Sequence, residues 1–302
     1  MNTAHDLMEQ LQGNGARLYA SSALATDHTC VVRKVRRDRA VRTSLLSVAG
    51  LAVAGAAAVG VANLRTAPLV PAATPTPPSA APSTIVDATI SVARQERVEY
   101  IADDLAEAFG ASRDEALDAL VAALPPEADG NPEGWIVSGE YTVDGGDIQA
   151  AANSLVSTMT GHLEAFDVPR DQWRQTVVLA SIIQQEAPTG RTDQAGVARV
   201  LLNRLDQGML LQIESPLAYD LRADENLISD DGWAVDTPFN TYMYEGLPPS
   251  PIGTSTMEAL DAAADPADGD WLYFLRKEDG NVLLFTTFEE FQAGLEEQGL
   301  PN

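Results

Sequence analysis

The feature that most limits what this chain of 302 residues can fold into is an uncharged run near its N-terminus, Thr43–Leu64. A helix rises about 1.5 Å per residue, so a helix over this run would be about 30 Å long, the thickness of the hydrocarbon core of a bilayer. The run is rich in Ala and Gly, which are frequent in transmembrane helices. The pattern predicts a single transmembrane helix over residues 43–64.

The charges on either side of this run predict its orientation. Directly before it lie Arg33, Lys34, Arg36, Arg37, Arg39 and Arg42. Positive residues beside a membrane span stay on the cytoplasmic side. We therefore expect residues 1–42 to form a cytoplasmic basic tail and everything after residue 64 to be extracellular, which makes this a single-pass protein of the cell membrane.

Two other interpretations of the run stay open. A cleaved signal peptide would need a basic leader far shorter than 42 residues and a small-x-small site soon after the apolar run. A buried helix of a soluble domain would normally show a polar face, and this run shows none. Both fit the sequence less well than a membrane anchor.

The segment after the run is a linker. Residues 65–83 contain APLVPAATPTPPSAAPS, and proline at this density favours an extended polyproline II conformation over helices or sheets. Such a spacer would hold the following domains away from the membrane.

Composition excludes several classes of function. From Arg65 onward the chain has 12 basic and 40 acidic residues, which argues against binding to nucleic acid. Cys30 is the single cysteine and the histidines number three, so a disulfide framework or a Cys/His metal site is not expected. We therefore predict no metal centre built from Cys or His.

The rest of the chain predicts an α+β fold with two parts. Residues 84–126 show a strand and two helices, the second opening with Ser112 and Glu115 in a capping-box pattern. This small β-α-α module is similar to carbohydrate-binding LysM domains. Residues 127–302 alternate strands and helices and are expected to form a second, larger domain.

Glu186 is the most informative residue of that domain. It ends the helical stretch VVLASIIQQEA and lies on the same face as Leu179, Ile182 and Ile183. A carboxyl at the end of an apolar stripe faces the core or a cleft, where burial disfavours its charged form and suits it to general acid catalysis. The alternative is that Glu186 simply ends the helix at the surface.

Polar and aromatic residues gather downstream of this helix. Gly208 is expected to end a helix; Asn203 lies before it, and Gln212, Glu214 and Tyr219 follow it. The stretch TPFNTYMYEGLPPSPIG then places Asn240 and Tyr242 beside a proline-rich turn. Aromatic faces stack on sugar rings while amides bind hydroxyls, so these residues suit a glycan. An ordered surface loop held by prolines is the alternative.

Five stretches together resemble one family. They are PEGWIVSGEYTV, LASIIQQEA, VLLNRLDQGMLLQIESPLAY, TPFNTYMYEGLPPSPIG and DWLYFL. In order and spacing they resemble the YceG-like endolytic murein transglycosylases, the MltG family of single-pass cell-wall enzymes, from about residue 84 to the C-terminus. The anchor and the linker also match the usual layout of this family.

The resemblance implies that Glu186 is the catalytic residue. It also implies that the side chains of Asn203, Gln212, Glu214, Tyr219, Asn240 and Tyr242 bind the glycan. The implied reaction cleaves the MurNAc-β-1,4-GlcNAc bond of nascent peptidoglycan and closes a 1,6-anhydro ring on MurNAc, without a cofactor. The implied partners are peptidoglycan strands and cell-wall synthases.

The sequence also departs from the family pattern. The family usually has Asp at Glu214, often Thr at Pro216, and usually Tyr at Phe239; it commonly has Asn-Pro-Gly where residues 254–256 are Thr-Ser-Thr, and His at Phe291. Arg outnumbers Lys by 17 to 2, which indicates a GC-rich genome such as that of an actinobacterium. These differences mark a divergent member and leave a second hypothesis open: a weak or inactive relative that binds glycan and scaffolds cell-wall synthesis proteins.

Overall fold

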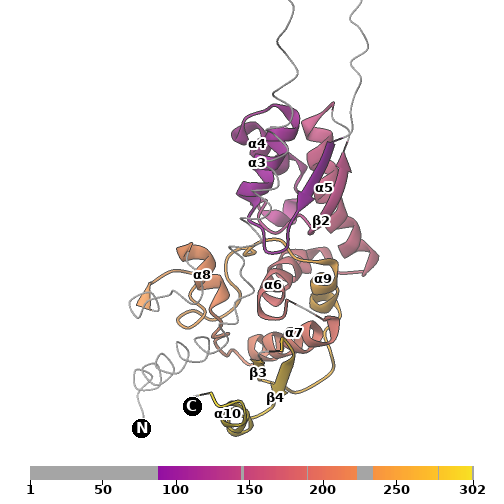
Figure 1. Cartoon of the computed structure of the whole chain (residues 1–302). Helices are drawn as coiled ribbons and strands as arrows, with labels where there is room; N and C mark the ends of the chain where they lie inside the picture. The colour runs from indigo at the N-terminus through magenta and orange to yellow at the C-terminus, as the bar shows by residue number, and fades with distance from the viewer. Residues whose placement is uncertain (1–87, 144–145, 189, 223–233, 278, 301–302) are drawn as a thin grey trace, which may run out of the picture. The chain divides into compact units, whose positions relative to one another are not determined.

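The computed structural model describes residues 88–143, 146–188, 190–222, 234–277 and 279–300 (Figure 1). These residues form a mixture of helices and short antiparallel strands, so the prediction of an α+β fold is confirmed. The predicted tail, transmembrane helix and linker lie outside the described residues. Within the described ranges, no helix is both long and apolar enough to cross a bilayer.

A first hydrophobic core is built on a two-stranded sheet. Strand β1 (Ala88–Val92) pairs antiparallel with β2 (Gly139–Val143), and α3 (Val98–Phe109) and α4 (Arg113–Ala123) lie between them in the chain. Side chains alternate across a strand, so β1 places Ile90 and Val92 in this core.

The helices of this first core follow the sequence closely. α3 buries Ile101 and Leu105 and ends at Gly110, whose φ of 63° is left-handed. The capping box predicted for α4 is present, because the Ser112 side chain accepts from the backbone of Glu115 and the Glu115 side chain accepts from the backbone of Ser112.

The first core extends beyond the predicted boundary between residues 126 and 127. Strand β2 and the first half of α5 (Ile148–Ala165) belong to it, through Val143, Ala152 and Leu155. The 84–126 module therefore shares its sheet and its core with residues of the following segment. Its likeness to a LysM domain stays a prediction.

A second core surrounds α6 (Trp173–Glu186). This helix is buried on almost every side, and it packs against α7 (Arg191–Asp206) and α9 (Met257–Ala264), as Figure 1 shows. Trp173 and Ile182 are among the largest fully buried side chains, and the polar residues Ser181 and Gln184 are buried with them.

The remaining elements border this second core. The hairpin β3 (Tyr273–Arg276) and β4 (Val282–Phe285) contacts α7, and α10 (Phe288–Glu297) packs on the hairpin. Two 3-10 turns, Pro126–Ala128 and Arg170–Gln172, join longer elements. The short helix α8 (Ser215–Leu221) contacts α6, and no helix was predicted there from the sequence.

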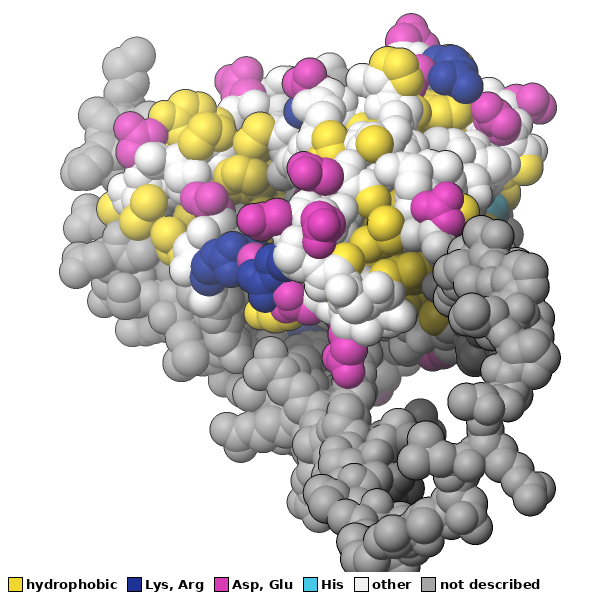
Figure 2. Space-filling view, turned by 90° about the horizontal axis from the view of Figure 1, so that it is seen from above, with side chains coloured by type: hydrophobic (Ala, Val, Ile, Leu, Met, Phe, Trp, Pro, Cys, Tyr) yellow, Lys and Arg dark blue, Asp and Glu magenta, His cyan; other side chains and the backbone are white. Residues whose placement is uncertain are grey.

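The acidic residues are dispersed over the face of the molecule that Figure 2 shows. Figure 2 shows Asp and Glu side chains dispersed over the viewed face among apolar and neutral groups, with basic side chains in fewer places. Dispersed charge of one sign favours solubility.

Candidate active site

The candidate site begins at the last residue of α6. Glu186 is 4% exposed, although the residue before it, Gln185, is half-buried. The helix turns this carboxyl towards the second core because Ile182 and Ile183, three and four residues earlier, occupy the same face. The expectation that Glu186 faces the interior is confirmed.

The carboxyl of Glu186 is oriented by a serine. The hydroxyl of Ser215 donates a hydrogen bond of 2.6 Å to Oε1 of Glu186, and Ser215 is itself buried. Ser215 is the first residue of α8, and Pro216 follows it in the first turn, where proline is well tolerated. A bond this short from a hydroxyl to a carboxyl group fixes the position of both.

Two further groups share this region with Glu186. Glu214 is 1% exposed and precedes Ser215 at the start of α8. Tyr242 is a half-buried residue nearby: burial of its hydroxyl, followed by the charges of Glu214 and Glu186, raises the pKa of that hydroxyl well above its ordinary value of 10. The structure therefore brings together three of the residues that the sequence predicted: Glu186, Glu214 and Tyr242.

A buried cation completes this group. Arg204 on α7 is 7% exposed, and its charge opposes the effect of the two carboxylates on the pKa of Tyr242. Its Nη1 donates to the carbonyl of Leu211 at 3.0 Å and its Nη2 to Oε1 of Gln212 at 2.8 Å. Burial lowers the pKa of Arg204. Arg204 thus links α7 to the segment that leads into Glu214.

Gln212, a predicted site residue, is held in an unusual conformation. Its φ is 54°, in the left-handed region that residues other than glycine seldom adopt. Its backbone N–H donates to the carbonyl of Thr241 at 3.1 Å, while the Thr241 hydroxyl donates to the carbonyl of Ile213 at 2.7 Å. The segments 211–214 and 240–242 therefore form one hydrogen-bonded layer beside Glu186.

Asn240, another predicted residue, orders this layer. It is fully buried, its Nδ2 donates to the carbonyl of Val235 at 3.0 Å, and its Oδ1 accepts from the N–H of Tyr242 at 3.1 Å. These bonds shape the turn that carries Tyr242.

Asn203 has a different environment. Its Nδ2 donates to the carbonyls of Gly269 and Trp271, at 3.0 and 2.9 Å, and so ties α7 to the segment before β3. Its predicted contact with glycan stays a prediction.

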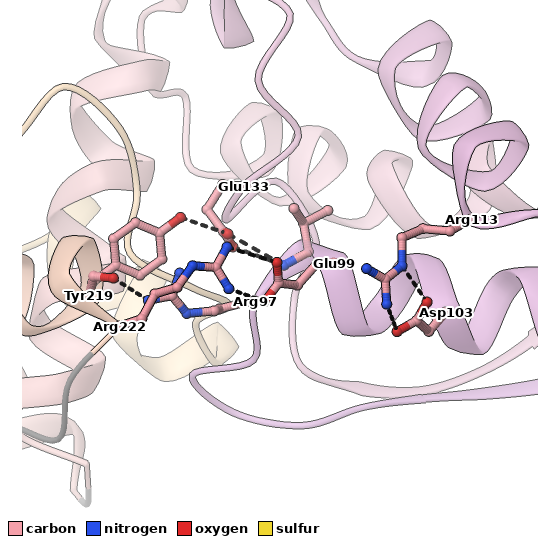
Figure 3. Close-up of polar contacts among 8 residues, drawn as sticks. Arg97, Glu99, Asp103, Arg113, Glu133, Tyr219 and Arg222 are labelled. Atoms are coloured by element: carbon pink, nitrogen blue, oxygen red, sulfur yellow. Dashed lines mark hydrogen bonds and ion pairs between the residues drawn. The ribbon is translucent and has the colours of Figure 1, made fainter.

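Tyr219 lies in a second polar cluster, four residues beyond Ser215 on α8. Its hydroxyl donates a bond of 2.9 Å to Oε2 of Glu133, and the guanidinium of Arg97 lies 3.9 Å from the centre of its ring. The same Arg97 donates to the carbonyl of Tyr219 (Figure 3). Its predicted contact with glycan also stays a prediction.

Sequence reasoning missed Glu133, which is as buried as Glu186 at 4% exposure. Burial raises the pKa of Glu133 from 4.5 to about 7, against the lowering effect of hydrogen bonds from Tyr219 and from the N–H of Val98. The sequence signal that could have found it is the order Glu133-Gly134, a glutamate directly before a glycine. Gly134 has a φ of 75°, and its missing Cβ leaves room for Pro251, so the backbone there requires a glycine.

Sequence reasoning also missed Ser215 and Arg204 as site residues. The Glu-Ser-Pro order at residues 214–216 is a helix-start signal that could have predicted α8 and hence the turn of Ser215. Arg204 stands in an otherwise apolar face of α7, a pattern that indicates a buried charge with a specific partner.

The unusual residues 254–256 serve the scaffold. The hydroxyl of Thr254 donates to the carbonyl of Ala93 at 2.6 Å and accepts from the N–H of Glu96 at 2.9 Å, so it joins the segment after β1 to the segment before α9. The hydroxyl of Thr256 accepts from the N–H of Ala259 at 3.2 Å and caps α9.

Two aromatic departures also pack within the scaffold. Phe291 on α10 stacks on Tyr273 with ring centroids 5.6 Å apart, and it meets Phe288 at 6.2 Å. Phe239 packs on Tyr219 at 5.7 Å. In the described part of the chain, no group of three or more His, Cys, Asp or Glu could hold a metal ion.

Comparison with known proteins agrees with the fold and the motifs. The fold and the site together define a class of protein: an α+β protein with a buried glutamate at the end of its central helix. The model of the YceG-like family matches residues 76–297. This match covers well over half of the sequence, and the chain belongs to the YceG-like family.

The chain is similar to proteins named endolytic murein transglycosylase. The one from Bacillus subtilis is 32% identical over 144 residues, which are 48% of this chain and 39% of that protein. The one from Streptococcus pneumoniae is 24% identical over 169 residues, which are 52% of this chain and 30% of that protein. The aligned regions thus span well under half the length of these relatives.

The chain is also similar to a solved structure. A yceG-like protein from Listeria monocytogenes matches with a TM-score of 0.57 and 24% identity, over 70% of this chain and 76% of that one. At this level of identity the likeness supports the fold.

Proposed function

We propose that this protein is an endolytic lytic transglycosylase, a lyase that cleaves peptidoglycan strands internally at the MurNAc-β-1,4-GlcNAc bond. The observation that carries the proposal is the buried carboxyl of Glu186, hydrogen-bonded at 2.6 Å to Ser215 and grouped with Glu214, Tyr242 and Arg204. The family membership and the names of its relatives agree with it.

Glu186 acts as both acid and base in the proposed reaction. Its protonated carboxyl gives a proton to the glycosidic oxygen, the bond from C1 of MurNAc to that oxygen breaks, and the GlcNAc end leaves with a free 4-hydroxyl. The oxygen of the C6 hydroxyl of MurNAc then bonds to C1, and its proton goes to the Glu186 carboxylate. No water is consumed, so the second carboxylate that activates water in inverting glycosidases is not required.

The groups around Glu186 have distinct parts in this reaction. Ser215 holds the carboxyl in one orientation, as efficient proton transfer requires. Glu214 supplies negative charge that stabilises the cationic sugar ring of the transition state. The cation of Arg204 offsets the two neighbouring carboxylates and holds Gln212 in place.

We further propose that residues 43–64 anchor the protein in the cell membrane, with residues 1–42 in the cytoplasm and the catalytic part outside. The support is the uncharged run and the basic cluster before it. In this arrangement the enzyme cuts nascent strands close to the membrane, and cell-wall synthases are the natural partners. The mature strands would be shorter as a result.

The test is the chemical identity of the products. The full chain, purified in detergent, is incubated with peptidoglycan and the released fragments are analysed by mass spectrometry. Strands that end in 1,6-anhydro-MurNAc, lighter by one water than hydrolysis products, are expected from the native chain and not from Glu186→Gln. Glu258→Gln, at an exposed position of α9, is the matched control and should cut normally.

Two results would contradict the proposal. Strands with hydrolysed ends in place of anhydro ends would show that the protein is a glycosidase. Equal activity of the native and Glu186→Gln proteins would show that Glu186 is not the catalytic residue. Glycan binding without cleavage by the native chain would favour the scaffold hypothesis instead.

A further inference from the structure

The second polar cluster joins three segments that are far apart in the sequence. The carboxylate of Glu133, from the turn before β2, accepts from the N–H of Val98 at 3.2 Å and from the hydroxyl of Tyr219 at 2.9 Å. Val98 is the first residue of α3, whose own N-cap residue, Arg97, makes no side-chain cap. Glu133 therefore caps α3 and binds α8 with the same carboxyl group.

Arginines reinforce this junction. Arg97 lies over the ring of Tyr219 and donates to its carbonyl, and Arg222 at the end of α8 makes two bonds to Glu99 on α3, of 2.8 and 3.0 Å. Figure 3 shows these contacts together. The Arg222–Glu99 pair is largely exposed and contributes little, whereas Glu133 is buried and its contact is the stronger restraint.

Helix α8 connects this junction to the candidate active site. Ser215 and Tyr219 are four residues apart, so both project from the same face of the helix. Ser215 contacts Glu186 and Tyr219 contacts Glu133. In a helix of seven residues, two such contacts one turn apart define both its position and its rotation about its axis.

We infer that Glu133 is a positioning residue: its carboxyl, bound to the first turn of α3 and to Tyr219, holds α8 so that Ser215 stays against Glu186. We call this restraint of α8 by the Glu133 carboxyl the hold on α8. The role of the hold in catalysis rests on the proposed function, but the restraint of α8 does not. No sugar or catalytic proton needs to reach Glu133.

The hold depends on pH in a predictable direction. Burial raises the pKa of Glu133 to about 7, although the Tyr219 hydroxyl, the charge of Arg97 and the backbone N–H groups of Val98 and Gly134 all act to lower it. A state in which α8 has moved away exposes Glu133 to water and returns its pKa to about 4.5. Raising the pH through this range therefore favours the open state, by an order of magnitude or more between pH 5.5 and 8.

Hydrogen exchange of the full chain measures the hold without any assay of activity. Peptides covering residues 215–222 are followed at pH 5.5 and pH 8 after correction for intrinsic exchange rates. The native chain should show protection at least tenfold lower at pH 8 than at pH 5.5. Glu133→Gln, which keeps the acceptor oxygen but cannot ionise, should be equally protected at both.

The control is Asp103→Asn, which breaks an exposed pair between α3 and Arg113 that does not touch α8. It should keep the native dependence on pH. Native protection that does not change with pH, or a change that persists in Glu133→Gln, overturns the inference.

A second readout concerns catalysis. If α8 positions Glu186, kcat for anhydro product should fall above pH 7 less steeply in Glu133→Gln than in the native chain, with KM unchanged. Identical pH profiles, or an effect on KM alone, overturn the positioning role. A native chain that makes no anhydro product refutes the proposed function, and the exchange experiment still decides the hold on α8.

Discussion

The two most informative glutamates of this protein are equally buried and differ in what surrounds them. Glu186 and Glu133 are each 4% exposed. Glu133 is bound by groups from α3 and α8, with a guanidinium beside it. Glu186 accepts a hydrogen bond from the Ser215 hydroxyl, in a region that also holds a second carboxylate, a phenol and a guanidinium.

Burial therefore does not by itself assign a role to a carboxyl group. Glu133 joins segments, since its partners are the helix start at Val98 and a side chain of another helix. Glu186 lies among groups that can share protons and stabilise charge, which is the arrangement expected of general acid–base chemistry. The following predictions test this division of roles.

The largest effect is expected at the cation of the Glu186 group. Arg204→Met removes two bonds from a buried guanidinium, to Leu211 and Gln212, and should lower the free energy of unfolding by about 3 kcal/mol. Urea unfolding measures the change. Arg199→Met on the same helix, which removes a bond to the carbonyl of Ala267, should cost less. Equal losses of unfolding free energy in the two variants would show that Arg204 contributes no more to stability than Arg199.

A comparable effect, of opposite sign and dependent on pH, is expected at Glu133. Its folded pKa, about 7, lies above its ordinary value of 4.5. The stabilisation from the neutral carboxyl is therefore complete below pH 4.5 and is lost as the pH rises through 7. Glu133→Gln should be more stable than the native chain at pH 8, by up to about 3 kcal/mol, with the advantage shrinking towards pH 4.5.

Thermal or urea unfolding across this pH range tests that prediction. An advantage of Glu133→Gln that is the same at every pH would mean that Glu133 does not titrate between pH 4.5 and 8. The proposed difference in role between Glu133 and Glu186 would then have no electrostatic support.

A smaller effect on rate is expected at the serine. Ser215→Ala removes the 2.6 Å hydrogen bond to Glu186 and should slow the formation of anhydro product by about 10- to 100-fold, because such a bond is worth about 1.5–3 kcal/mol. Ser157→Ala, at an exposed position of α5, is the control and should leave the rate unchanged. A normal rate in Ser215→Ala would show that the contact between α8 and Glu186 is not needed for catalysis.

The smallest effect is expected at a scaffold position. Thr256→Ala removes the cap of α9 and should lower the free energy of unfolding by about 1 kcal/mol while cleavage continues. Loss of cleavage with unchanged stability would show that the departure at residues 254–256 belongs to the site and not to the scaffold.

Much of the fold could be predicted from local patterns. The apolar stripe of α3, the capping box of Ser112 and Glu115, and the interior face of Glu186 were all predicted from residues no more than a few positions apart. Helix α8 was missed because its seven residues are too few for a clear periodicity.

The composition of the site was predicted less completely. Gln212, Glu214 and Tyr242 were expected beside Glu186 by family resemblance, but the serine and the arginine that orient and balance them were not. The positions of Asn203 and Tyr219, in contact with the backbone before β3 and with Glu133, follow from packing between distant segments.

The sequence by itself determined the secondary elements with strong periodicity, the uncharged run at residues 43–64, and the placement of one carboxyl at the end of an apolar helix face. Only the tertiary structure decided which carboxyl meets which partner: Glu186 with Ser215, 29 positions away, and Glu133 with Tyr219, 86 positions away. The physical reason is that periodicity reports the burial of a side chain, whereas its hydrogen-bond partners are supplied by segments that only the packed chain brings together.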